Sequence, residues 1–507
     1  MKTVLQPYVV LCSAIVFMTT IYSTNGIWYG DFWEHSAVIK AILLQPGHPS
    51  HPFFISTEPH AFNSPYAYLV ASYIYVTGVS VITGLSTAGI VNLILLLCAL
   101  HYFVQSIYKQ FPSNASFYAL LCVLLLWGHE AWGYSGFYYY KLLPYVLPYP
   151  STFCVAMVFF ALAINIRTQG AIHRSALVTI GAITSVVLLS HPLTFIFLIT
   201  GLSGQCFRSG AQLISRHNLT LACAVLVGAL LSFLWPFYPL HTLLTQGSNV
   251  FHESNEMMYE DVLIRMWPIF VSLPLAYRAW CKKSLRSVFI TVTLLSAIYL
   301  FGYWSQKYSL GRTISFIALL LQICIGLGIA SWEQALSAHF PRIERFVSLA
   351  LIVATVLLSL PLLMPALTRS LTVAKSLVLG RTVSNQQSYK YLVFLEDAIK
   401  PNSLVLSDIE TSWKVPTFNG KVIAALHAQA FVPDDNDRRR DVANFFDRRA
   451  SAETRLAIIE RYKPEYLLLD KRAQYDWSQL SDAYSGASNE GLVYENEQYQ
   501  LIRLKFE

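Results

Sequence analysis

Charged side chains are scarce in this sequence, and the scarcity is confined to one part of it. Only 13% of the 507 residues are charged, whereas 55% are hydrophobic, a balance that ordinary soluble domains do not have. Through residues 1–367 the charges form short clusters between long apolar runs, and from residue 368 onward they are scattered throughout. This pattern excludes a single soluble fold. It predicts a transmembrane helical bundle over 1–367 and a soluble domain over 368–507.

Cysteine is absent from the parts that are expected to face water. All 8 cysteines lie within or at the ends of apolar segments. None falls in residues 25–64 or 368–507, and no spacing is that of a zinc finger, so neither a disulfide framework nor a structural zinc site is expected. The formal net charge is +7, but Lys and Arg lie mainly beside apolar segments, where the positive-inside bias explains them. No nucleic-acid partner is therefore predicted.

Apolar runs recur along residues 1–367 at the length that crosses a bilayer. A hydrocarbon core about 30 Å thick needs about 20 apolar residues in a helix that pairs its own backbone groups. The first run is preceded by one basic residue, Lys2, and lacks a small-residue cleavage site, so we interpret it as an uncleaved helix. The candidate spans are residues 7–24, 65–83, 88–106, 116–133, 148–166, 175–191, 193–207, 219–238, 262–280, 287–304, 314–331 and 346–366.

Basic clusters between the spans indicate their orientation. The clusters at 167–174, 208–216, 282–286 and 342–345 are typical of cytoplasmic loops. Counting outward from them places the C-terminal domain on the extracytoplasmic face of a plasma (inner) membrane. Twelve spans would put the 25–64 loop on the opposite face, so we expect an odd total, 11 or 13, with one segment between 65 and 147 miscounted or one helix there re-entrant.

The C-terminal residues predict a small α/β domain. Short β-type runs occur at 403–407, 421–425, 466–469 and 499–504, and apolar residues recur at helical spacing over 452–462. The acidic start and basic continuation of 434–440 are typical of a helix N-terminus. A sugar-binding role for that stretch is the less favoured alternative.

The long first loop, residues 25–64, carries the most informative residues. It opens with an aromatic stretch, 28–33, around Asp31. Residues 36–44 are expected to form a short interfacial helix that places Asp31 and His35 four residues apart on one face. We take both as catalytic candidates, although an acid after a span is otherwise a solvated end residue. The loop histidines do not match a known metal-ligand spacing, so the metal content is left unknown.

Ionisable residues at the ends of apolar segments form a second group of candidates. Each is costly near lipid unless it is paired or faces water. Glu130 is taken as a third catalytic candidate, and His191, Lys307 and Arg312 as ligands of a lipid phosphate, because a guanidinium offers a fork of donors to two phosphate oxygens. The alternative for each is an interfacial anchor without a further role.

These features together resemble the C-type (GT-C) superfamily of membrane glycosyltransferases. Asp31 matches the acid at the start of that family's first extracytoplasmic loop, and residues 36–44 match its first juxtamembrane helix. Arg312 matches the donor-phosphate ligand more loosely. The C-terminal stretches 404–408, 410–412, 431–434 and 466–470, together with Pro416 and His427, resemble the tail domain of an uncharacterised bacterial branch. The paired acid motifs of the oligosaccharyltransferase and protein-mannosyltransferase branches are not evident.

The resemblance implies a fold and an activity. The fold would be an α-helical polytopic bundle with about 11–13 transmembrane helices and a small extracytoplasmic α/β domain. The activity would be inverting transfer of a hexosyl or pentosyl group from a polyprenyl-phosphate donor to a cell-envelope glycan, lipid or protein acceptor, with Asp31 as general base. The cofactor is left unknown: the resemblance fits an enzyme that needs a divalent cation, Mg²⁺ or Mn²⁺, and equally one that needs no cofactor.

Two other functions fit the composition. A transporter or flippase for a lipid-linked or polar substrate would use the same ionisable residues as its path, but it predicts inverted repeats and charges at mid-bilayer depth. A non-catalytic assembly subunit would keep the fold without the chemistry. Here the ionisable residues gather near span ends and a soluble domain follows the bundle, which favours the transferase.

Overall fold

The computed structural model describes residues 6–24, 30–107, 114–128, 131–169, 173–207, 215–246, 255–270, 285–339, 344–358, 360–379, 388–473 and 489–504. Its contacts divide the chain into two compact units. Unit 1 comprises residues 1–25, 86–235 and 240–381, and unit 2 comprises residues 26–85, 236–239 and 382–507. The first loop therefore belongs to the same unit as the C-terminal segment.

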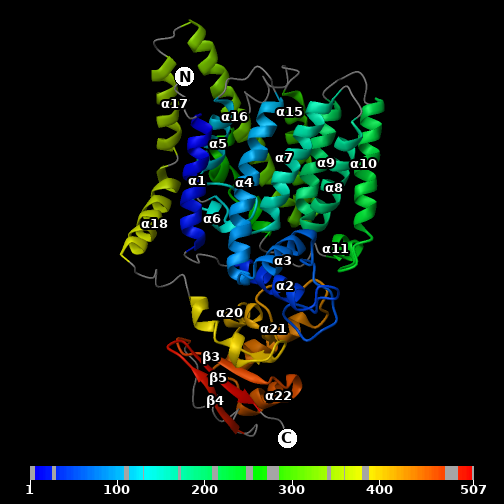
Figure 1. Cartoon of the computed structure of the whole chain (residues 1–507), viewed down its shortest axis with the longest axis vertical. Helices are drawn as coiled ribbons and strands as arrows, with labels where there is room; N and C mark the ends of the chain where they lie inside the picture. The colour runs from blue at the N-terminus through cyan, green and yellow to red at the C-terminus, as the bar shows by residue number, and fades with distance from the viewer. Residues whose placement is uncertain are drawn as a thin grey trace. The chain divides into compact units, whose positions relative to one another are not determined.

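Unit 1 is a bundle of helices that run side by side (Figure 1). Four helices of the described part, Val81–Ile107, Pro150–Thr168, Arg286–Trp304 and Tyr308–Leu336, are long and apolar enough to cross a membrane. Shorter apolar helices accompany them. The helical elements are α1 (Pro7–Thr24), α4 (Val81–Ile107), α5 (Ala115–Leu125), α6 (Leu143–Val146), α7 (Pro150–Thr168), α8 (Arg174–Ser190), α9 (Pro192–Cys206), α10 (Arg216–Ser232), α11 (Leu240–Gln246), η3 (Met257–Tyr259), α13 (Val262–Phe270), α15 (Arg286–Trp304), η4 (Tyr308–Arg312), α16 (Thr313–His339), α17 (Glu344–Leu358) and α18 (Leu360–Val378).

Small residues allow pairs of helices in unit 1 to approach closely. A Cβ on Gly326 of α16 would collide with the backbone of Ala119 of α5, and one on Gly228 of α10 would collide with the carbonyl of Gly181 on α8. The Ser185 hydroxyl donates to the Gly228 carbonyl at 2.5 Å. Small residues and cross-helix hydrogen bonds are what hold helices together where lipid removes the hydrophobic drive.

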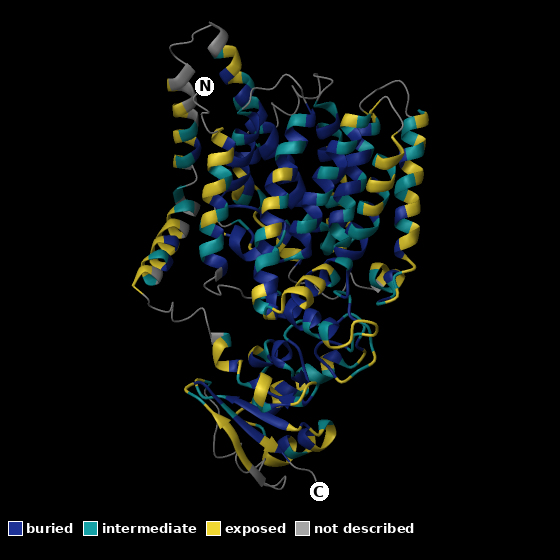
Figure 2. Cartoon of the chain, in the orientation of Figure 1, coloured by how far each residue is buried: buried dark blue, intermediate teal, exposed yellow. Residues whose placement is uncertain are grey.

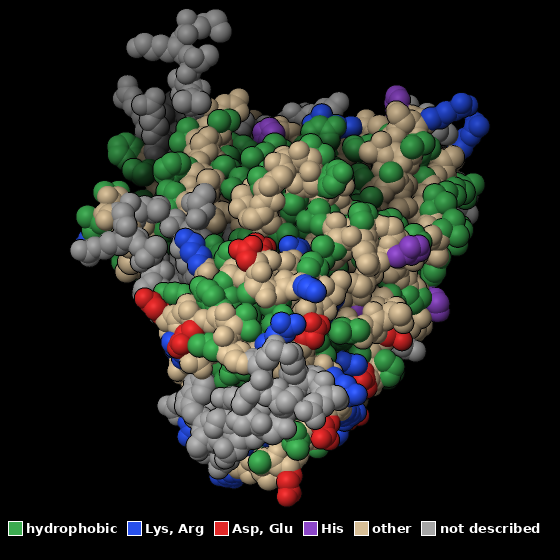
Figure 3. Space-filling view, turned by 60° about the horizontal axis from the view of Figure 1, so that its bottom comes forward, with side chains coloured by type: hydrophobic (Ala, Val, Ile, Leu, Met, Phe, Trp, Pro, Cys, Tyr) green, Lys and Arg blue, Asp and Glu red, His purple; other side chains and the backbone are tan. Residues whose placement is uncertain are grey.

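The surface of unit 1 is apolar, as a lipid-facing bundle requires. Exposed side chains include Leu219 and Leu230 of α10, Leu300 and Trp304 of α15, and Phe346 of α17. Figure 2 shows the exposed residues on the outward sides of these helices and the buried ones between them. In the space-filling view, hydrophobic side chains cover the helical part, and acidic and basic side chains gather toward the lower half of the picture (Figure 3).

Unit 2 combines the first loop with the C-terminal α/β segment. The loop contributes α2 (Phe32–Leu44) and α3 (Pro65–Thr77), which pack together. The C-terminal segment forms a five-stranded sheet in the order β2-β1-β3-β5-β4. Strand β1 is parallel to β2 and β3, and β5 is antiparallel to β3 and β4. The elements are η5 (Ser388–Leu392), α19 (Leu395–Ala398), β1 (Leu404–Leu406), α20 (Ile409–Ser412), η6 (Val415–Phe418), β2 (Lys421–Val422), α21 (Asp435–Phe446), α22 (Ala452–Tyr462), β3 (Tyr466–Asp470), β4 (Asn489–Glu495) and β5 (Tyr499–Leu504).

The core of the α/β part lies between the sheet and helices α21 and α22. Leu406, Leu467 and Leu469 of the sheet pack against Phe445 and Ile459 of these helices. The predicted helix at 452–462 is α22, and its first turn is capped by Ser451, whose hydroxyl accepts from the Thr454 amide at 3.2 Å. The acidic stretch expected to start a helix does so, because α21 begins at Asp435.

Two expectations about the segments need correction. The predicted span 65–83 is interrupted: α3 has 13 residues and ends at Gly78, whose φ of 69° closes the helix in the left-handed region. At 1.5 Å per residue it reaches only about 20 Å, too short for the hydrocarbon core. The total number of spans and their orientation stay predictions.

The predicted boundary between residues 367 and 368 is also wrong. It falls inside α18, which continues to Val378, and the two units divide after residue 381. Charged residues such as Arg369 and Lys375 lie on this helix, so their appearance in the sequence marks the end of the apolar run rather than the end of the helix. The predicted span 346–366 is helical on both sides of residue 359, which lies outside the described residues.

Arg455 provides a test of how the α/β core is held. Its side chain is 1% exposed, and its Nε and Nη2 donate to the carbonyls of Phe445 and Asp447 at 2.9 and 2.6 Å. Arg455→Met leaves both carbonyls without their donors, the Phe445 carbonyl in a buried site, and is expected to reduce the local unfolding free energy of α21 and α22 by about 2–4 kcal/mol. Hydrogen exchange of the full-length protein measures this directly. Arg440→Met, at a 65% exposed side chain, should leave exchange unchanged; equal protection in both variants would contradict the assignment.

Candidate functional site

The start of α2 presents a carboxylate that the helix does not use. Asp31 occupies the N-cap position, yet its side chain makes no capping hydrogen bond. Gly30, with φ at 66°, turns the chain into the helix, and the indole Nε1 of Trp413 donates to its carbonyl at 2.9 Å. The turn that carries Asp31 is therefore fixed by a side chain from the C-terminal segment. The Asp31 side chain remains 49% exposed.

His427 is the partner of this carboxylate. Its Nε2 lies 3.4 Å from Oδ1 of Asp31, and the Trp413 ring packs edge-on against it, with ring centroids 4.9 Å apart. Burial opposes the charged imidazole, but the hydrogen bond and the negative charge of Asp31, helped by Glu34, outweigh it and raise the pKa of His427. Asp31 and His427 thus form a half-exposed acid–imidazole pair.

A second, buried polar cluster lies along the same helix. Oε1 of Glu34 is 3.2 Å from Nε2 of His60, and both side chains are almost fully buried. The amide of Gln429 joins them: its Nε2 donates to Glu34 at 3.3 Å and its Oε1 lies 2.8 Å from the His60 ring. A buried carboxylate needs such partners. The cluster fixes the face of α2 that is one turn from Asp31.

His35 differs from the expectation that it acts beside Asp31 on an open face. Its side chain is buried and stacks on Phe62 with ring centroids 4.7 Å apart. Burial lowers the pKa of His35 to about 4, against the opposing charges of Asp31 and Glu34. The imidazole is therefore neutral at physiological pH. Its catalytic role remains a prediction, and its visible contacts are those of a packing residue.

The first loop is held to the C-terminal segment by a buried ammonium. Nζ of Lys421 on β2 donates to the carbonyls of His51 and Pro52 and to the Ser50 hydroxyl. Its pKa is lowered to about 8 by burial. The amide of the next residue, Val422, donates to the Phe53 carbonyl at 2.7 Å. Hydrogen bonds thus join residues 50–53 of the first loop to strand β2 of the C-terminal segment.

The remaining predicted residues lie in unit 1. Nε of Arg312 donates to Asn255 at 3.0 Å and Nη1 to Ser135 at 3.5 Å, and the guanidinium lies over the ring of Tyr134, 5.3 Å from its centroid. Lys307 is exposed at the start of η4.

His191 and Glu130 complete the set of predicted residues. His191 is the N-cap of α9: its ring accepts from the Thr194 amide at 3.2 Å and bonds the Thr194 hydroxyl at 2.7 Å. This contact is what a helix N-terminus requires. Glu130 lies outside the described residues.

The described residues contain no preformed set of metal ligands. Among the residues that the structure describes, no three His, Cys, Asp or Glu side chains gather so as to hold an ion. Asp31 and Glu34 are each engaged with a histidine instead.

Gln429 offers a test of the buried cluster. Gln429→Met leaves Glu34 and His60 without the amide that joins them, at an expected cost of about 1–3 kcal/mol. We expect faster limited proteolysis of the 30–64 segment in the full-length protein. Gln500→Met removes an exposed hydrogen bond to Glu495 and should leave the cleavage rate as in the wild type. Unchanged cleavage in Gln429→Met would show that the cluster does not hold the loop.

Comparison with solved structures identifies the fold. No protein-family model and no curated protein matches the sequence. ArnT from Cupriavidus metallidurans, bound to undecaprenyl phosphate, is similar with a TM-score of 0.54 at 12% identity, over 98% of each chain. The oligosaccharyltransferase of Archaeoglobus fulgidus, in complex with Zn and sulfate, is similar with a TM-score of 0.57 at 12% identity, over 91% of this chain and 68% of that one. At such identity the likeness is one of fold, and the chain has the fold of the GT-C polytopic membrane proteins, with a small C-terminal sheet.

Proposed function

We propose that this protein is a membrane glycosyltransferase that moves a sugar from a polyprenyl-phosphate donor to a hydroxyl of a cell-envelope glycan, lipid or protein, with Asp31 as general base. The observation that carries the proposal is the Asp31–His427 pair: a half-exposed carboxylate, released from helix capping and held by an imidazole. The fold shared with ArnT, whose structure contains undecaprenyl phosphate, supports the choice of donor.

The reaction follows from the acid at this position. Asp31 takes the proton of the acceptor hydroxyl as its oxygen attacks the anomeric carbon. The bond from that carbon to the phosphate oxygen breaks, and polyprenyl phosphate leaves with the electron pair. Direct displacement of this kind inverts the configuration at the anomeric carbon. The leaving group is stable as an anion, so the protein must supply a base and cations for the phosphate rather than a general acid.

His427 acts as a positioning residue in this scheme. Its hydrogen bond orients the Asp31 carboxylate, whose base strength depends on the charge of the ring. An imidazolium beside Asp31 stabilises the carboxylate and weakens it as a base, whereas a neutral ring leaves it stronger. The acidic groups facing His427 are Asp31 and Glu34, and the basic group is Arg439.

Removing the carboxylate is the first test. Asp31→Asn keeps the size of the side chain but cannot take a proton, so transfer of radiolabelled sugar from polyprenyl-phosphate donors to membrane extracts should fall by about 10²–10⁴-fold. The matched control is Asp397→Asn, an exposed acid in the first turn of α19, which should transfer at the wild-type rate. Full transfer by folded Asp31→Asn would remove the central residue of the proposal. Absence of transfer by the wild type from every donor tested would favour the transporter or assembly roles.

The pH dependence of transfer tests the role of His427. Because its pKa is raised in the folded protein, the imidazolium persists above the ordinary value of 6.5, and transfer should increase as pH rises through the raised pKa. His427→Gln keeps a hydrogen-bond donor without a charge, so the acidic limb of the rate profile should move to lower pH, with several-fold faster relative transfer at acid pH. An identical limb in both proteins would exclude His427 from controlling Asp31.

The raised pKa of His427 also affects folding stability. Stability and transfer are expected to depend on pH in opposite directions. A group whose pKa is raised on folding stabilises the fold below its unfolded pKa, and that contribution is lost as pH rises through the folded value. While Asp31 is ionised, the pair should therefore stabilise unit 2 more just below pH 6.5 than above the raised pKa of His427.

A further inference from the structure

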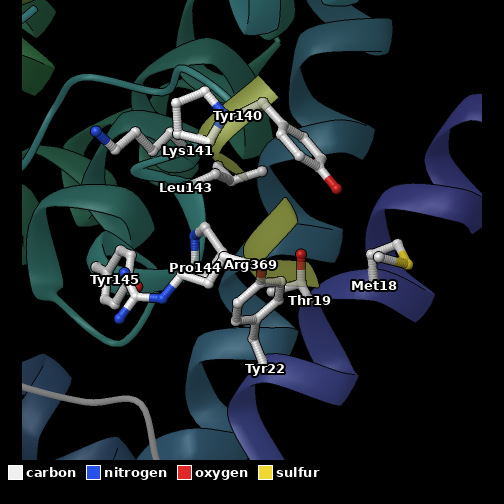
Figure 4. A pocket seen from close by; sticks show the side chains of 10 residues that line it. Met18, Thr19, Tyr22, Tyr140, Lys141, Leu143, Pro144, Tyr145 and Arg369 are labelled. Carbon is white, nitrogen blue, oxygen red and sulfur yellow. The ribbon is translucent and has the colours of Figure 1, made fainter. Parts of the chain in front are cut away.

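Polar side chains at the edge of an open hollow can be hydrated, whereas buried ones depend on partners within the protein. The cavity of about 140 Å³ that α1, α6 and α18 line is an example of the first case (Figure 4). Lys141 and Arg369, the two cations in its lining, are both exposed, so neither needs an anion. Trp413, directly after α20, is an example of the second case. It is 2% exposed, and its buried N–H needs an acceptor.

Trp413 contacts three separate parts of unit 2. Its Nε1 donates to the Gly30 carbonyl at 2.9 Å, in the turn before α2. Its ring stacks on that of Phe53 in the first loop, with centroids 4.9 Å apart and an angle of 9° between the planes. The ring of His427, which follows β2, lies perpendicular to the indole with centroids 4.9 Å apart. One side chain therefore joins the backbone that leads into Asp31 to the imidazole that faces it.

The bond to Gly30 holds the peptide unit that leads into Asp31. The accepting carbonyl belongs to the same planar amide as the Asp31 nitrogen, so the bond restrains the backbone rotations on either side. Gly30 has a φ of 66°, where other residues are strained, and its carbonyl also accepts from the Trp33 amide at 3.2 Å. Both lone pairs of this carbonyl are thereby engaged. The Asp31 side chain makes no capping bond to the helix, so the position of its carboxylate follows from this turn.

His427 is held at both its backbone and its ring. The side-chain amide of Gln429 donates to the His427 carbonyl at 3.0 Å, and the perpendicular indole limits rotation of the imidazole. The 3.4 Å between His427 Nε2 and Asp31 Oδ1 exceeds the length of a short charge-assisted hydrogen bond, about 2.7–2.9 Å. The strength of this contact therefore depends on how firmly both partners are held.

We propose that Trp413 is a positioning residue for the Asp31–His427 pair. Its N–H holds the turn that presents the carboxylate, and its ring holds the imidazole, so one side chain sets the distance between the two groups. The link to transfer rests on the function proposed above, whereas the geometric role is measured on the pair itself. Packing alone would require the rings of Trp413 and not its nitrogen. The two roles separate when the N–H is removed and the shape is kept.

The pKa of His427 reports how closely the carboxylate approaches. Burial opposes the charged ring, and the contact with Asp31 outweighs it and raises this pKa. Full-length protein with isotope-labelled histidine is titrated in detergent by NMR, and the His427 signal is identified by its loss in His427→Gln. Benzothienylalanine in place of Trp413 keeps the two-ring shape without the N–H, and Trp413→Phe keeps one ring. Both should lower the pKa of His427 to a value between those in the wild type and in Asp31→Asn.

A second indole serves as the control. Trp127→Phe removes a similarly buried N–H, which donates to the Val123 carbonyl at 2.8 Å in unit 1, and should leave the pKa of His427 as in the wild type. Glu34 and Arg439, which also face His427, are unchanged in every variant. A wild-type pKa in the benzothienylalanine protein, with or without a decrease in Trp413→Phe, would overturn the role of the N–H.

Transfer kinetics connect this geometry to the reaction. A looser pair should lower kcat by about tenfold at an unchanged KM for the donor, because only the transition state is affected. The acidic limb of the rate profile should move to lower pH together with the pKa of His427. Full transfer by Asp31→Asn would refute the base role of Asp31 and leave the pKa result standing. A lowered pKa with a wild-type kcat and an unmoved limb would overturn the link between Trp413 and transfer.

Discussion

The buried ammonium of Lys421 is the contact on which the arrangement of unit 2 depends. A lysine inside a protein must have its three donors satisfied, because an unpaired charge in a low-dielectric interior is strongly unfavourable. Here the acceptors are backbone carbonyls and a hydroxyl of residues 50–52. With the adjacent bond from Val422 to Phe53, they fasten a loop from the start of the chain to a strand near its end. Trp413, His427 and Gln429 of the same C-terminal segment contact Gly30, Asp31 and Glu34 at the start of α2.

The two polar groups on α2 have different physical characters, and the difference suits different tasks. Glu34 is buried with His60 and Gln429, so its charge is compensated within the protein and it serves to fix the helix. Asp31 begins the same helix and faces water across half of its surface. One turn of helix thus separates a buried, fully partnered acid from an accessible one.

The sequence predicts the helices of unit 1 well because lipid imposes a length and a composition on each of them. It makes Asp31 a catalytic candidate because the residue follows a span in a long, titratable loop, and that role stays a prediction. The buried cluster around Glu34 could not be predicted in this way: His60 and Gln429 are 369 residues apart in the chain, and no spacing rule links side chains at that distance. His427 stood out only within a stretch that resembles other tail domains. The short helix α3 was taken for a span because its apolar composition hides the break at Gly78, and only the backbone conformation shows it.

The hydrogen bond from Lys421 to Ser50 joins residues 371 positions apart in the chain. This separation determines the order in which the parts of unit 2 can assemble during synthesis. At a synthesis rate of about 5–20 residues per second, on the order of a minute separates the appearance of the two residues. During that interval the rings of Phe53 and Phe54, which are fully buried in the finished protein, have no C-terminal segment to cover them. The carboxylate at residue 31 is made among the first residues and oriented among the last. A chain that stops before residue 427 therefore carries the acid without its histidine.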